Sequence, residues 1–136
     1  MKLENLLNSQ EVTETGQSLR QSRESVNIKS LESLLSRWES TAEKLQKGFD
    51  FSIYDLQEDL AARSNLEPLL ERLPPAIREK LKTWLEPIDD QYRSATLEAG
   101  FSLMAGKADH TAWWCYRIPK RASLEFKKEL RGLTSS

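Results

Sequence analysis

The sequence has a single cysteine, Cys115, among its 136 residues. One thiol cannot close a disulfide within the chain, which excludes the class of small disulfide-stapled domains and agrees with a reducing compartment. No apolar run approaches the roughly 18 residues of a membrane span. The first residues also lack the apolar stretch of a secretory signal. We therefore expect a cytoplasmic protein with no membrane partner.

Motifs that hold cofactors or metals are also missing from the sequence. The five glycines are scattered along the chain, so none forms a phosphate-cradling loop. A structural zinc site needs four ligands, and His110 and Cys115 are single copies. The same two residues would lie on opposite faces of a strand, because they are five apart, which argues against a nucleophile pair. We expect no cofactor, no metal and no catalytic activity.

The charged residues are balanced in number but uneven in position. Lys and Arg total 20 and Asp and Glu total 21, which argues against nucleic-acid binding by the whole chain. Residues 50–91 hold five basic and ten acidic side chains, whereas residues 92–136 hold eight basic and four acidic ones. Two interpretations follow: the segments neutralise each other, or each presents a charged face to a partner.

Helical periodicity dominates the sequence after the first 26 residues. Apolar residues recur at steps of three and four over 27–47, and related patterns occupy 52–64, 66–73, 75–100 and 122–131. Pro87 lies inside the fourth pattern, where proline kinks or breaks a helix. The sequence predicts an all-α fold, a small bundle of four to six helices around one core.

Residues 1–26 are polar and offer few anchors for a core. We predict an N-terminal arm there that is flexible or weakly helical, with a short helix at 3–8. Residues 27–136 are predicted to form a single helical domain.

The segment Thr111–Pro119 is aromatic and β-prone, and it predicts an extended segment near the C-terminus without a partner strand. On an extended chain Trp113 and Cys115 would face one way, and Trp114 and Tyr116 the other. A small helical core can hardly bury both faces. One face would then be open to a second chain, whereas in the alternative interpretation the rings close the end of the core.

Aromatic and basic residues gather in and after this segment. Trp, Tyr and Arg are the side chains found most often at binding hot spots. The candidate partner-binding residues are Trp113, Trp114, Tyr116, Arg117, Lys120 and Arg121.

These residues predict a non-catalytic protein-binding module, such as a small inhibitor, an immunity-type protein or an adaptor. Its partner would be another protein with an acidic surface, and a homodimer through the same segment is a variant. The alternative is a nucleic-acid-binding regulator, in which the rings stack on bases and the cations meet phosphates.

Overall fold

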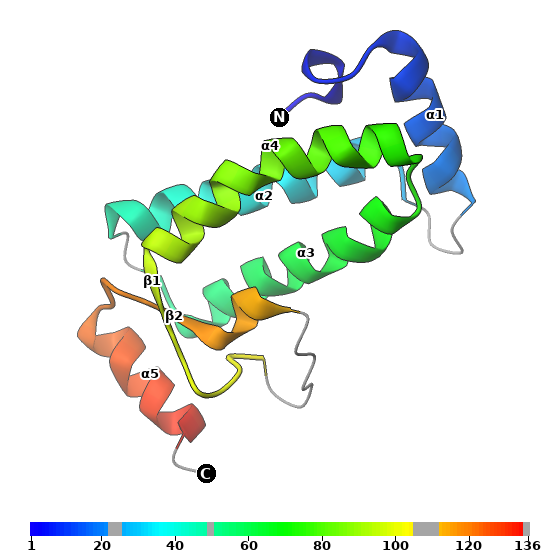
Figure 1. Ribbon diagram of the computed structural model, residues 1–136. Helices are drawn as coiled ribbons and strands as arrows, with labels where there is room; N and C mark the ends of the chain where they lie inside the picture. The colour runs from blue at the N-terminus through cyan, green and yellow to red at the C-terminus, as the bar shows by residue number, and fades with distance from the viewer. Residues whose placement is uncertain (22–25, 49–50, 105–111, 135–136) are drawn as a thin grey trace.

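The computed structural model describes residues 1–21, 26–48, 51–104 and 112–134 (Figure 1). Five α-helices dominate these ranges, which confirms the predicted all-α bundle. They are α1 (Ser9–Arg20), α2 (Ile28–Lys47), α3 (Ile53–Glu71), α4 (Pro75–Ser94) and α5 (Leu124–Thr134).

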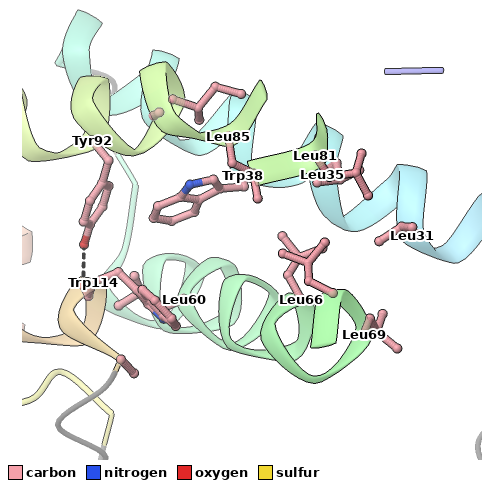
Figure 2. Packing of buried hydrophobic residues seen from close by; sticks show 14 of the residues in the cluster. Leu31, Leu35, Trp38, Leu60, Leu66, Leu69, Leu81, Leu85, Tyr92 and Trp114 are labelled. Carbon is pink, nitrogen blue, oxygen red and sulfur yellow. Dashed lines mark hydrogen bonds between the residues drawn. The ribbon is translucent and has the colours of Figure 1, made fainter. Parts of the chain in front are cut away.

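Helices α2, α3 and α4 enclose the core. α2 packs against both α3 and α4, and Figure 1 shows α2 and α4 running alongside each other above α3. Leucines from the three helices point toward one another around the ring of Trp38 (Figure 2). The core is thus one continuous apolar cluster, as the periodic pattern predicts.

Local signals set the bounds of α2. The side chain of Asn27 accepts a hydrogen bond from the backbone N–H of Ser30, which caps the first turn. Gly48 follows the last residue with a φ of 74°, a left-handed conformation that glycine adopts without strain. Both ends lie within a residue of the predicted helix.

α3 is one helix where the sequence pattern predicted two, at 52–64 and 66–73. Its start is capped reciprocally by Ser52 and Asp55, and it continues through Pro68 to Glu71. The predicted break is wrong because Leu66 and Leu70 extend the buried stripe of the first half across the polar residues between them.

α4 passes through Pro87 as a single helix, so of the two predicted outcomes the broken helix does not form. It ends at Ser94 and not near residue 100. The residues that follow form strand β1 (Thr96–Glu98), which pairs antiparallel with β2 (Arg117–Pro119). The expectation that the C-terminal strand has no partner is therefore wrong.

The N-terminal residues contain more structure than the short helix predicted at 3–8. A 3-10 helix, η1 (Leu3–Asn5), precedes α1, whose 12 residues begin with a capping box between Asn8 and Glu11. Leu3 and Leu19 are both buried, and the Lys80 side chain of α4 donates to Glu11 at 2.7 Å. A domain boundary at residue 26 stays a prediction.

A buried cation joins the three core helices. The Arg63 side chain is only 5% exposed and donates to Glu67 at 2.6 Å and to Asp89 at 3.2 Å. Asp89 also accepts the indole N–H of Trp38 at 2.8 Å. The Arg63 guanidinium lies 5.7 Å from the Trp38 ring centroid and 4.2 Å from that of Trp114.

We predict that Asp89→Asn lowers the free energy of unfolding by about 3 kcal/mol, because it removes the carboxylate that balances the buried Arg63. Urea unfolding followed by circular dichroism measures the change. Asp90→Asn is the matched control: Asp90 makes an exposed ion pair with Arg93, so its loss costs less than about 1 kcal/mol. Equal effects of the two substitutions would contradict a central role for the Arg63–Asp89 pair.

Candidate functional site

The aromatic segment is helical over Trp113–Tyr116, where it forms the 3-10 helix η2, and extended only over β2. The prediction of an extended chain through the aromatic residues is therefore wrong for η2. Successive side chains of a 3-10 helix point about 120° apart and do not alternate between two faces. The predicted grouping of Trp113 with Cys115, and of Trp114 with Tyr116, is lost with the strand.

Trp114 belongs to the core. Its side chain is buried, with 3% of the residue exposed, and its indole N–H donates to the Ser64 hydroxyl at 2.9 Å. Its ring covers the guanidinium of Arg63, and Figure 2 shows it lying against α3 near Leu60. Trp114 thus closes the end of the helical core, which matches the alternative interpretation of the rings.

Tyr92 fixes η2 to α4 from inside the protein. Its hydroxyl donates to the backbone carbonyl of Trp114 at 2.6 Å, the bond drawn as a dashed line in Figure 2. Its ring centroid lies 4.7 Å from that of Trp38. Burial raises the pKa of the Tyr92 phenol far above its ordinary value; the nearby Cys115 adds to this effect and Arg117 opposes it.

Trp113 is half-buried and faces the rim of the bundle. Its ring centroid is 5.8 Å from that of Tyr92, and the guanidinium of Arg93 lies over it at 4.0 Å. These residues border a groove of about 470 Å³, here called the aromatic groove. The groove is lined by Arg93, Glu98, Ala99, Trp113, Tyr116 and Arg117.

The Arg117 side chain lies along the wall of the groove and is held there by hydrogen bonds. Its Nε donates to the Thr96 hydroxyl at 2.7 Å, and Nη2 donates to the carbonyls of Arg93 and Thr96, both at 3.2 Å. The side chain is 16% exposed and also pairs with Glu98 at 3.9 Å. It therefore connects β2 to the end of α4.

The structure divides the six predicted residues into separate environments. Trp113, Tyr116 and Arg117 line the aromatic groove, whereas Trp114 lies in the core. Lys120 and Arg121 are exposed beyond β2 and do not line the groove.

Sequence analysis missed Arg93, Glu98 and Ala99 as groove residues. Arg93 lies on α4, next to the Tyr92 that bonds η2. Glu98 and Ala99 are brought to the groove by the pairing of β1 with β2, in which Glu98 lies opposite Arg117. That pairing joins segments about twenty residues apart, and no spacing within either segment signals it. Thr111–Pro119 is β-prone, but Thr96–Glu98 contains only one β-branched residue, so the sequence carries no clear signal for the pairing.

The remaining chemical candidates are only partly covered by the described residues. His110 lies outside them, and Cys115 is buried. Where the chain is described, no group of three or more His, Cys, Asp or Glu side chains is placed to hold a metal ion. Nor does this part of the chain include a helix of the length and apolar character required to cross a membrane.

The chain matches no protein-family model, no curated protein and no solved structure with which it was compared.

We predict that the protein loses stability as the pH rises above about 10, where an unfolded tyrosine ionises. In the folded protein Tyr92 keeps its proton above pH 10, because burial raises its pKa. The stability that Tyr92 contributes is therefore complete below about pH 10 and is lost as the pH rises further. The expected slope is at most about 1.4 kcal/mol per pH unit, measured by urea unfolding.

Tyr92→Phe should flatten this alkaline slope, and it should cost about 1 kcal/mol at neutral pH through loss of the bond to Trp114. Tyr54→Phe, which alters an exposed tyrosine, is the control and should keep the slope. An unchanged slope in Tyr92→Phe would show that other groups cause the alkaline loss.

Proposed function

We propose that this chain is a non-catalytic protein-binding module whose aromatic groove receives part of another protein. The observation that carries the proposal is the contact between half-buried Trp113 and Arg93. The Arg93 guanidinium lies 4.0 Å from the centroid of the Trp113 ring, and Tyr116 lines the same groove. Trp, Tyr and Arg are the residues that dominate binding energy at interfaces. Each combines a large apolar area with a polar group that can still hydrogen-bond.

The groove is ordered before any partner arrives. The Trp113 ring packs against Tyr92, whose hydroxyl donates a hydrogen bond to the carbonyl of Trp114. Arg117 of β2 donates a hydrogen bond to the backbone of α4. Side chains that are already fixed lose little conformational entropy on binding. This rigidity favours recognition of a partner surface by a preformed site.

The charged groups of the groove suit recognition better than proton transfer. Arg93 pairs with Asp90 at 2.9 Å and Arg117 with Glu98 at 3.9 Å. Lys120 and Arg121 are exposed beyond the groove, where they would steer an acidic partner surface toward it. A cytoplasmic inhibitor, immunity-type protein or adaptor fits this arrangement, as does a homodimer in which a second copy occupies the groove.

Nucleic-acid binding by the same rings and cations is the alternative function. Glu98 argues against it, because its side chain is 91% exposed at the groove and would repel evenly spaced phosphates, whereas a protein can place its acidic side chains near Lys120 and Arg121 and away from Glu98. A protein partner is therefore the better supported ligand.

We predict that Trp113→Ala and Arg93→Ala each weaken binding of the partner by about 30-fold or more, the loss typical of an interface hot spot. The partner is first cross-linked to the wild-type protein, identified by mass spectrometry and purified. Calorimetry then measures its affinity for each variant. Tyr54→Ala removes an exposed aromatic ring outside the groove and should bind as the wild type does.

A purified partner that binds Trp113→Ala and the wild type equally would overturn the proposal, provided that circular dichroism shows both to be folded. Binding of oligonucleotides that weakens steeply with salt and depends on Trp113 would establish the alternative. A dimeric mass in light scattering that becomes monomeric in Trp113→Ala would identify the partner as a second copy.

A further inference from the structure

Helix α5 is attached to the bundle by one face. Phe126 is buried, and its ring meets that of Phe51 edge-on with centroids 6.2 Å apart. Leu130, one turn further along, is partly buried against the core cluster. Phe126 and Leu130 define the inner face of α5, which contacts the bundle mainly at α3.

The opposite face of α5, here called the outer face, carries Leu124, Lys127, Lys128 and Arg131. Positions three, four and seven apart lie on one side of a helix, so these four side chains form a single stripe. All four residues are exposed. Leu124 is 76% exposed, more than any other large apolar residue in the described part of the chain.

The lysines of this stripe differ from the arginines of the aromatic groove. Arg93 and Arg117 both pair with carboxylates, whereas neither Lys127 nor Lys128 forms an ion pair with a described residue. A cation without an intramolecular partner loses no existing pair when a ligand carboxylate binds it. Lys127 and Lys128 therefore offer positive charge that no ion pair within the described part of the chain uses.

We propose that the outer face of α5 binds an acidic segment of a protein, with carboxylates on Lys127 and Lys128 and an apolar contact for Leu124. The basic stripe is complementary in charge to the carboxylates of such a segment. The exposed Leu124 supplies an apolar contact of the kind that interfaces surround with polar ones. This inference extends the proposed function and rests on it in one respect, that the ligand is a protein.

The composition of α5 favours an acidic protein over other polyanions. Glu125 and Glu129 follow one flank of the stripe, where they would repel the evenly spaced phosphates of a nucleic acid. A membrane-binding helix needs a broad apolar face, whereas among the described side chains of α5 the exposed apolar one is Leu124, which lies among cations. A protein segment can place its carboxylates on the lysines and keep away from the glutamates.

The test titrates the 136-residue chain, labelled with ¹⁵N, with a helical peptide of about 16 residues that carries glutamates and two leucines on one face. We predict saturable shifts of the amide signals of α5 that weaken as NaCl is added. Lys127→Glu combined with Lys128→Glu should weaken binding by about tenfold or more. Leu124→Ser should weaken binding of this peptide but not of a peptide of glutamates alone.

The matched control combines Lys29→Glu with Lys44→Glu, which reverses two exposed lysines on α2 and should leave the affinity unchanged. Trp113→Ala should also leave it unchanged, so failure of this inference is separable from failure of the groove. The proposal is overturned by an absence of saturable shifts in α5, or by equal loss in the control. Tighter α5-dependent binding of duplex DNA, or of vesicles of phosphatidylcholine and phosphatidylserine, would also overturn it.

Discussion

The fold depends on a positive charge held inside the bundle. Removing the Arg63 guanidinium from water is costly, so its position is stable only while Asp89 and Glu67 stay beside it. The indoles of Trp38 and Trp114 cover the cation and exclude water from it. One buried cation thus connects the core helices, through its ion pairs and the two indoles, with a segment from a later part of the chain.

The exposure of Trp113 follows from the burial of its neighbour. Trp114 must point at Arg63, and successive side chains of a 3-10 helix diverge by about 120°. Trp113 therefore cannot enter the same part of the core, and its ring lies between Tyr92 and Arg93 at the rim. The aromatic groove is consequently a by-product of the way the core is closed.

Elements set by neighbouring residues were predictable, and those set by distant ones were not. α2 has its cap, apolar stripe and terminal glycine within one stretch, and its bounds were predicted closely. The split of α3 and the omission of α1 were errors of local pattern, because continued packing carries α3 through Ser64 and Asn65 and docking stabilises a polar helix. The six candidate residues included three that line the groove, but the sequence could not show that Arg93 joins them.

The basic residues near the C-terminus have different roles that charge alone does not reveal. Arg117 is committed to the backbone of α4 and β1, whereas Lys127 projects from the outer face of α5. The five steps from Pro119 to Leu124 span at most about 18 Å, even if fully extended. An interface of ordinary size is roughly 30 Å across, which exceeds this span. A protein that covered both proposed surfaces would meet the aromatic residues of the groove and the lysines of α5 together.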